Sequence, residues 1–241
     1  FHQREGWGFN WYRSINNDAR NWIPTQIELK GFEWKLADDK QTATLSAQHE
    51  ATVGKNKVSY TVTYQLHTDG TVDVNASFTT GENFNFPRLA LQAFFNPALE
   101  NLEWYGRGPI ENYQDRKNAA YIGRYQSKVD AMNEYYVRAQ SMGERCDTRW
   151  ITLCDDNGSG VKISANKPFD FSALHYTDQD LWNVKHSHDL GEIRRAEIVV
   201  NMDCIQRGLG NASCGPGPRP KYEIKKNAIY TYSFSMSPFK K

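Results

Sequence analysis

The sequence lacks an excess of charge of either sign and lacks any long apolar run. It holds 29 Lys and Arg residues against 28 Asp and Glu residues, a formal net charge of +1. This balance excludes a strongly basic nucleic-acid-binding protein and an acidic tail. No stretch approaches the roughly 18 consecutive apolar residues of a transmembrane helix. No charged segment followed by an apolar one marks a signal peptide, and the absence of low-complexity stretches argues against disorder.

Cysteine is also scarce. The four cysteines are Cys146, Cys154, Cys204 and Cys214. They are too few for a disulfide scaffold, and no Cys-x-x-Cys pair or histidine at zinc-ligand spacing accompanies them. Cys204 and Cys214 could form one disulfide bridge, but four reduced thiols are the simpler interpretation. The cysteines therefore do not indicate whether the protein works in an oxidising or a reducing compartment. His186 and His188 form an H-x-H pair without a third ligand at a known spacing, so we predict no metal site and no cofactor.

What the sequence does have is an alternation of apolar and polar residues with a period of two, which is typical of half-buried β-strands. Over 58–66, Val, Tyr and Leu alternate with Ser, Thr and Gln, and Asp69-Gly70 then predicts the turn of a hairpin over 57–80. Shorter strand-like stretches lie near 32–36, 43–47, 88–95, 119–125, 134–139, 148–154, 161–165, 196–203 and 230–236. A capping box at Thr177 predicts one short helix. Many short antiparallel strands with one helix indicate a sandwich or barrel.

The length of 241 residues permits one large all-β domain or two smaller ones, and no repeat or linker-like stretch divides the chain. The long irregular segment is 207–220, RGLGNASCGPGPRP, with four glycines and three prolines. A loop of this length inside a compact domain is usually functional or disordered. Its composition predicts a shaped surface rather than a tether.

Residues 104–116, WYGRGPIENYQDR, combine aromatic rings with planar hydrogen-bonding groups. Trp104 offers a flat apolar face, which suits the C–H side of a sugar ring. The side chains that offer planar partners for hydroxyl groups are those of Arg107, Glu111, Asn112, Asp115 and Arg116. The alternative is a buried turn in which these groups satisfy one another and the backbone, which is the commoner outcome.

Residues 143–150, GERCDTRW, place Arg145, Asp147 and Arg149 on one face of an expected strand. This face could bind a carboxylate or a polyol, but a structural ladder of ion pairs is the commoner outcome. No pair of acids lies in a recognisable glycosidase setting, and no nucleophile elbow, P-loop or dinucleotide motif is present. The residues alone therefore indicate a β-rich domain with sugar-compatible surface chemistry.

Five blocks, in order, resemble the C-terminal, small-chain domain of lacZ-type β-galactosidases of glycoside hydrolase family 2. Residues 104–116 fit the family pattern WYGRGPxENYxDR, and residues 142–150 fit its GxRxDxRW run. The other blocks are 10–18 (NWYRSINND, with Ile15 where proline is usual), 171–181 (FSALHYTDQDL) and 201–216 (NMDCIQRGLGNASCGP). Together they cover essentially the whole chain.

The resemblance implies a large antiparallel supersandwich like that of galactose mutarotase, with residues 1–241 as a single domain and a fragment of a longer multidomain enzyme. Such an enzyme hydrolyses terminal β-galactosides with retention, through two glutamates on a TIM barrel that this sequence lacks. The chain is therefore expected to carry no catalytic residue and to be inactive alone. Its implied partners are the other domains and a β-galactoside, without nucleic acid or membrane. The resemblance does not decide whether the longer enzyme forms oligomers, or whether it lies in the bacterial cytoplasm or periplasm.

In the family this domain packs on the barrel and closes one wall of the active site, and residues 206–215 are our candidate for that wall, since glycine allows close backbone approach. The candidate substrate-binding residues are Trp104, Arg107, Glu111, Asn112, Arg116, Arg149, His175, Gln206, Asn211 and Cys214. Two alternatives stay open. One is an autonomous carbohydrate-binding module. The other is a mutarotase-like aldose epimerase, for which His175 is the one histidine to consider, although no motif pairs it with a base.

Overall fold

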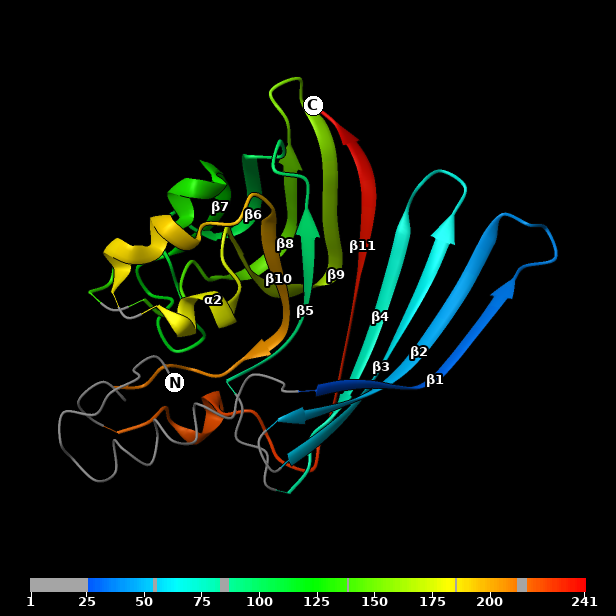
Figure 1. The fold of residues 1–241 in the computed structure, drawn as a ribbon, viewed down its shortest axis with the longest axis horizontal. Helices are drawn as coiled ribbons and strands as arrows, with labels where there is room; N and C mark the ends of the chain where they lie inside the picture. The colour runs from blue at the N-terminus through cyan, green and yellow to red at the C-terminus, as the bar shows by residue number, and fades with distance from the viewer. Residues whose placement is uncertain (1–25, 54–55, 83–86, 138, 185, 212–215) are drawn as a thin grey trace.

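The computed structural model describes residues 26–53, 56–82, 87–137, 139–184, 186–211 and 216–241, and most of them lie in β-strands (Figure 1). The strands are β1 (Gln26–Leu36), β2 (Thr42–Val53), β3 (Asn56–His67), β4 (Val72–Thr79), β5 (Arg88–Phe95), β6 (Asn101–Gly108), β7 (Tyr121–Lys128), β8 (Arg145–Cys154), β9 (Ser159–Leu174), β10 (Ile198–Gln206) and β11 (Ile229–Lys240). The helical segments are η1 (Val129–Met132), α2 (Asp178–Asn183), η2 (Ser187–Ile193) and η3 (Pro220–Tyr222). The predicted all-β class is confirmed. Within the described ranges, no helix has the length and apolarity to span a bilayer.

The strands pair antiparallel in one large sheet, with the order β1-β2-β3-β4-β11-β9-β8-β6-β7. Strand β10 leaves this path and pairs with both β9 and β5. In Figure 1, β1–β4 fan away from the half of the molecule that holds β5–β10. The Tyr232 hydroxyl of β11 ties the halves together, because it accepts from the Leu91 amide at 3.0 Å and donates to the Met202 carbonyl at 2.9 Å. The predicted large antiparallel sheet is confirmed.

The hairpin expected over 57–80 is present as β3 and β4. Its alternation buries Val62 and Val74, while the polar residues between such positions point the other way. Gly70 closes the turn with a φ of +85°, a conformation that residues with a side chain rarely adopt. Local sequence was therefore sufficient to predict this element and its register.

The core of the second half lies between the inward faces of β6, β8, β9 and β10. Its side chains of less than 2% exposure include Leu102, Trp104, Ile151, Ile163, Phe171 and Ile198. The Trp104 ring centroid lies 5.4 Å from that of Tyr125 and 6.1 Å from that of Phe171, distances that are typical of stabilising aromatic pairs. Trp104, which opens the most distinctive motif, is thus a core residue.

The predicted helix begins where its capping box placed it. The Thr177 hydroxyl accepts from the Asp180 amide at 3.1 Å, and the Asp180 carboxylate accepts from the Thr177 amide at 2.8 Å. The helix ends at Asn183, because Val184 has an extended backbone with φ −88° and ψ 134°. The helix therefore ends before the H-x-H pair of His186 and His188.

The strand predicted over 134–139 is wrong. The described residues of this segment form a loop, and the Tyr135 and Val137 side chains are exposed. Aromatic and β-branched residues favour an extended backbone, but a strand also needs a partner edge. The local composition predicted an extended backbone, but whether a neighbouring strand is available to pair with it depends on the tertiary structure.

We expect Gly160→Ala to destabilise the fold, because Gly160 in β9 lies against the backbone of β8. A Cβ at this position would lie 1.9 Å from the Leu153 carbonyl oxygen and 2.7 Å from the Cys154 Cα. The free energy of unfolding, measured in urea, should fall by about 1–3 kcal/mol or more. Gly191→Ala is the control, since a Cβ there meets nothing within 4 Å. Equal effects of the two substitutions would contradict the β8–β9 register.

Candidate functional site

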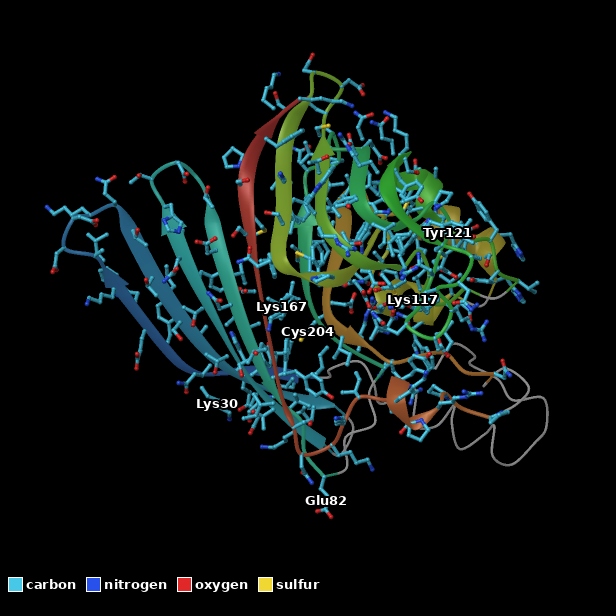
Figure 2. All side chains as sticks on the ribbon, turned by 180° about the vertical axis from the view of Figure 1, so that it is seen from behind. Lys30, Glu82, Lys117, Tyr121, Lys167 and Cys204 are labelled. Carbon is cyan, nitrogen blue, oxygen red and sulfur yellow. The ribbon has the colours of Figure 1, made fainter. Side chains whose placement is uncertain are left out.

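The polar side chains of the 104–116 motif turn toward the protein. Arg107 on β6 donates through Nε to the Asp147 carboxylate and through Nη1 to the Ala120 carbonyl at 2.8 Å. Lys117, labelled in Figure 2, donates to both Asp147 oxygens at 3.1 and 3.0 Å. Burial alone would raise the pKa of Asp147, but hydrogen bonds from Arg107 and Lys117 hold it below the usual value. Arg107 is therefore part of a half-buried ion cluster.

Glu111 and Asn112 fix the segment that enters β8. The Glu111 carboxylate accepts from the Gly143 amide at 2.7 Å and from the Tyr136 hydroxyl. The Asn112 side-chain oxygen accepts from the Cys146 amide at 3.0 Å. These contacts join the 104–116 motif to the GERCDTRW run, which lies some 30 residues further along the chain. The two distinctive motifs of the sequence thus form one structural unit.

The last two residues of the same motif, Asp115 and Arg116, contact the loop that follows β10, residues 207–220, which we call the Gly/Pro loop. The two Asp115 carboxylate oxygens accept from consecutive backbone amides, Leu209 at 3.0 Å and Gly210 at 2.7 Å. The guanidinium of Arg116 donates to the Gly210 carbonyl. A carboxylate that accepts two backbone amides makes charge-assisted hydrogen bonds, which are stronger than neutral ones. This contact, which we call the Asp115 clamp, fixes the first part of the loop.

Two glycines make the Asp115 clamp possible. A Cβ at Gly208 would lie 2.8 Å from the Asp115 Cγ, so a side chain there would push the carboxylate away. Gly210 has a φ of +59°, and a Cβ there would lie 2.4 Å from the Pro218 nitrogen. Further along, the Asn211 amide donates to the Pro216 carbonyl at 2.9 Å, which folds the loop back on itself.

Gln206, the last residue of β10, carries unpaired polar atoms at the base of this loop. Its side chain is 2% exposed, and neither its Oε1 nor its Nε2 has a hydrogen-bond partner among the described residues. Buried amides are normally paired, because leaving them unpaired costs about 1–3 kcal/mol. Among the described residues, Gln206 is thus a buried amide whose hydrogen bonds are not satisfied.

A second buried cluster surrounds Arg88 at the start of β5. Arg88 makes a bidentate pair with Asp203 at 2.7 and 2.8 Å, and it contacts Glu144 at 2.9 Å and Asp178 at 3.1 Å. Asp203 and Glu144 are buried, with side-chain exposures of 0% and 2%. One cation thus faces three carboxylates.

Burial, together with neighbouring carboxylates, raises the pKa values of Asp203 and Glu144. Burial raises the pKa of Asp203 to about 6, although the Arg88 guanidinium opposes the shift. Burial and the neighbouring carboxylates raise the pKa of Glu144 well above its ordinary value, and its Oε1 has no partner in the described part of the chain. Glu144 is therefore the member of the cluster that holds a proton most readily.

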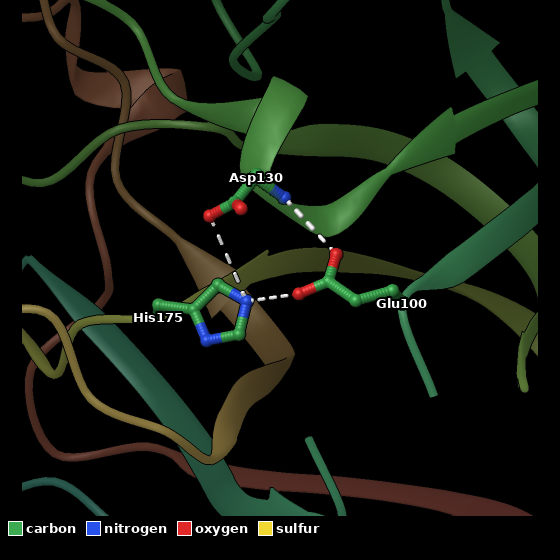
Figure 3. A group of neighbouring side chains, drawn as sticks. All are labelled: Glu100, Asp130 and His175. Carbon is green, nitrogen blue, oxygen red and sulfur yellow. Dashed lines mark hydrogen bonds and ion pairs between the residues drawn. The ribbon is translucent and has the colours of Figure 1, made fainter. Parts of the chain in front are cut away.

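His175 lies in a separate ion network with Glu100 and Asp130 (Figure 3). The network borders an open pocket of about 480 Å³. The Nδ1 of His175 faces the carbonyl oxygens of Arg195 and Glu197, both at 3.1 Å, and its Nε2 faces the Glu100 carboxylate. Both ring nitrogens thus face acceptors. Asp130 contributes a second carboxylate, 3.8 Å from Nε2.

Glu100, Asp130 and His175 also have the donor set of a metal site, since their ligand atoms lie within 4.8 Å of one another. However, Arg194 donates to the two Asp130 oxygens at 3.0 and 3.1 Å and approaches Glu100 at 3.5 Å. Arg194 is thus a cation that already contacts both carboxylates. The arrangement is best described as an ion network of two carboxylates, a guanidinium and an imidazole.

The cysteines and the H-x-H pair have simple environments. Cys146, Cys154 and Cys204 carry free thiols, and burial raises the pKa of Cys204 to about 12, which makes it unreactive. His188 pairs with Asp189 at 3.1 Å and its ring stacks on that of His186, with 5.2 Å between centroids.

The ten predicted binding residues do not form one open surface. Four are almost fully buried: Trp104, Asn112 and His175 at 1% exposure and Gln206 at 2%. Arg107, Glu111, Asn112 and Arg149 lie around the entry to β8, where Arg149 donates to the Asp147 carbonyl and covers the Tyr105 ring at 5.7 Å. Arg116, Gln206 and Asn211 lie along the Gly/Pro loop, and Cys214 lies outside the described residues.

Sequence reasoning missed the residues that do the positioning. Asp115 was recognised as a hydrogen-bonding group of the motif, but it was left out of the predicted binding residues, and its contact with the loop was not predicted. Glu144 and Asp203 also stand inside quoted blocks, and Arg88 opens a predicted strand. The sequence did show an unusual number of acids in strand-forming blocks, which indicated that some of them are buried. It did not show that Arg88 is the common partner of these acids.

Comparison with known proteins gives these features a family context. A family profile described as "Beta galactosidase small chain" matches residues 2–236. The β-galactosidase of Priestia megaterium is 28% identical over 237 residues, which cover 95% of this chain and 23% of the relative. The β-galactosidase of Streptococcus thermophilus is 32% identical over 188 residues, which cover 77% of this chain and 18% of the relative. This chain thus spans about a fifth of the length of these relatives.

Among solved structures, a GalM/aldose epimerase homologue from C. elegans aligns with a TM-score of 0.44 at 9% identity. The alignment covers 86% of this chain and 68% of that chain.

The Arg88 cluster predicts a pH-dependent effect of Glu144→Gln. The raised pKa of Glu144 means that its contribution to stability is present below about pH 4.5 and is lost as the pH rises, because the folded state keeps a proton that the unfolded chain releases. Glutamine mimics the protonated acid. The variant should gain stability over the wild type as the pH rises above about 4.5, by up to about 1.4 kcal/mol per pH unit in urea unfolding.

The exposed Glu82, labelled in Figure 2, supplies the control variant Glu82→Gln, which should follow the wild type at every pH. A difference between Glu144→Gln and wild type that does not change with pH would contradict the raised pKa.

Proposed function

Because the chain belongs to the β-galactosidase small-chain family, we propose that it is an accessory domain of a longer β-galactosidase that cleaves terminal β-galactosides. Two relatives with that name are matched over only 23% and 18% of their length, which supports a role as one part of a larger enzyme. In this proposal the whole chain, residues 1–241, forms a single domain, and its partners are the other domains of the enzyme.

We propose that the acids of this chain take no part in bond cleavage. A retaining glycosidase needs two carboxyl groups about 5–5.5 Å apart on either side of the bond that breaks, with the substrate between them. The buried acids Glu144 and Asp203 instead face a common arginine, Arg88. Their place in the fold suits stability rather than proton transfer to a substrate.

We propose further that the loop after β10 forms one wall of the galactoside-binding site. The Asp115 clamp is the observation that carries this proposal. A wall contributes to binding only when its position is fixed in advance, because ordering it during binding would reduce the affinity. A carboxylate on two consecutive amides, together with Arg116 on the next carbonyl, supplies that rigidity.

Gln206 supports the same proposal from the base of the loop. Its two polar side-chain atoms are buried and have no partner among the described residues. A sugar hydroxyl both donates and accepts, and it would satisfy either atom of the amide. A backbone group of a neighbouring domain would satisfy the Gln206 amide equally well. Either partner, sugar or domain, fits a binding site that is completed by the rest of the enzyme.

One aromatic pair on β6 and β8 gives little support to an autonomous carbohydrate-binding module. Tyr105 and Trp150 lie side by side on the outward face of β6 and β8, with 6.4 Å between centroids. The guanidinium of Arg149 lies over the Tyr105 ring at 5.7 Å, and that of Arg124 lies over the Trp150 ring at 5.5 Å. These cations occupy ring faces on which a sugar would stack.

Asp115→Asn in the longer enzyme tests the wall. The asparagine keeps one acceptor oxygen but turns an NH₂ group toward a loop amide, so the loop should loosen. We expect KM for a nitrophenyl β-galactoside to rise about tenfold, which corresponds to about 1.4 kcal/mol. Asp155→Asn is the matched control, because Asp155 also accepts from two backbone amides, those of Asn157 and Ser159 at 2.9 Å, but in the β8–β9 turn.

The control variant should keep KM within about twofold of wild type. If Asp115→Asn accelerates tryptic cleavage of the loop while KM stays unchanged, the loop is no part of the binding site. Saturable binding of galactose or lactose by the isolated 241-residue chain would instead favour the carbohydrate-binding module.

A further inference from the structure

The loop between η1 and β8 exposes large apolar side chains. Tyr135 is 81% exposed and Val137 is 88% exposed, and Tyr136 between them is 38% exposed. Ile110, in the turn that follows β6, is 52% exposed. Single exposed apolar residues are ordinary, but a contiguous group of large ones marks an interaction surface. We call these four residues the Tyr135 patch.

The members of the Tyr135 patch lie on neighbouring segments. The Tyr136 hydroxyl donates to the carboxylate of Glu111, the residue that follows Ile110 in the chain. The same carboxylate accepts from the Gly143 amide at 2.7 Å, near the end of the loop. Glu111 therefore joins the exposed loop to the turn that carries Ile110.

Further contacts fix the backbone of the loop. The Ser187 hydroxyl donates to the Tyr136 carbonyl, and the Ser187 amide donates to the Val137 carbonyl at 3.5 Å. Inside the loop, the Tyr136 amide donates to the Glu134 carbonyl at 2.9 Å. The loop is thus attached both to η2 and to the 104–116 motif, yet its apolar side chains point outward. A surface that is fixed in advance loses less entropy when it binds a partner.

The Tyr135 patch lies near the Gly/Pro loop. Arg116, whose guanidinium donates to the Gly210 carbonyl, belongs to the same 104–116 motif as Glu111. Burial and the Glu111 carboxylate raise the pKa of Tyr136 above its ordinary value, and the charge of Arg116 opposes this shift. Such an effect falls off with distance, so Arg116 lies close to the Tyr136 hydroxyl. One motif therefore connects the patch with the loop that we propose as a wall of the galactoside site.

We propose that the Tyr135 patch docks onto the part of the longer polypeptide that carries the rest of the galactoside site. The partner surface would be an apolar cleft with a polar group that bonds the Tyr135 hydroxyl, because a tyrosine at an interface presents an apolar ring with a polar end. This inference rests on the proposed function, in which the chain is one part of a longer enzyme. About four-fifths of the length of the two relatives lies outside the matched region, so a covalently linked partner is available.

Hydroxyl-radical footprinting, read by mass spectrometry, tests this proposal in the longer enzyme and in the 241-residue chain. Tyr135 should be modified at least about tenfold more slowly in the longer enzyme, because the core of an interface excludes water. The double variant Tyr135→Ser/Val137→Ser removes the two most exposed members of the patch. In the longer enzyme it should raise the modification rate of Tyr136 to that measured in the 241-residue chain.

Tyr121→Ser is the matched control. Tyr121, labelled in Figure 2, has a similar exposure of 72%, but it lies in β7, where its backbone pairs with Gly108. This variant should leave the slow modification of Tyr135 in the longer enzyme unchanged, and loss of the protection would contradict a contact that is specific to the patch. In the 241-residue chain, Tyr135→Ser/Val137→Ser should shift Tm by no more than about 2 °C, because surface substitutions change stability little.

Three further outcomes would overturn the proposal. Equal modification rates of Tyr135 in the two contexts would show that the patch stays exposed in the longer enzyme. A large fall in Tm of the 241-residue double variant would show that the two side chains pack within this chain. A dimer of the 241-residue chain, detected by light scattering and split by the double variant, would assign the patch to a second copy. None of these readouts measures KM, so failure of the docking surface is distinct from failure of the proposed wall.

Discussion

The hydrogen bonds between the Asp115 carboxylate and the amides of Leu209 and Gly210 decide where the Gly/Pro loop lies. A loop rich in glycine loses much conformational freedom when it is ordered, so it needs strong local contacts to stay in one conformation. The clamp supplies them from a segment some 95 residues earlier in the chain. That segment is in turn fixed by the Arg107–Asp147 pair, so the loop, the motif and the entry to β8 depend on one another.

In the ion clusters around Arg88 and His175, polar side chains pair with one another and stabilise the fold. Each acid in the Arg88 cluster is within hydrogen-bond distance of one guanidinium. The charges do not balance, and the raised pKa of Glu144, which favours its neutral form, reduces the difference. Around His175, two carboxylates, Arg194 and the imidazole ring form a network whose charges balance more closely. In both places, groups that a sequence reader would assign to a ligand are satisfied within the protein.

The fold was largely predictable because its elements are defined by local patterns. Alternation gave the β3–β4 hairpin, and the capping box gave the start of α2. The candidate site was less predictable. Arg107 and Asn112 were recognisable as unusual residues, but their partners lie in other motifs, and Trp104 is buried by rings from β7 and β9 rather than exposed to a sugar. The strand expected over 134–139 failed for the same reason, since it lacks a partner edge.

The sequence by itself determined the strand alternation, the turn at Gly70, the helix cap and the set of motifs that mark the family. These properties depend on residues close together in the chain, where spacing alone decides which side chains share a face. Only the tertiary structure decided that Asp115 holds the loop, that Arg88 contacts three acids and that Trp34 of β1 is exposed. Each of these depends on contacts between segments far apart in sequence, and the geometry of such contacts is set by packing.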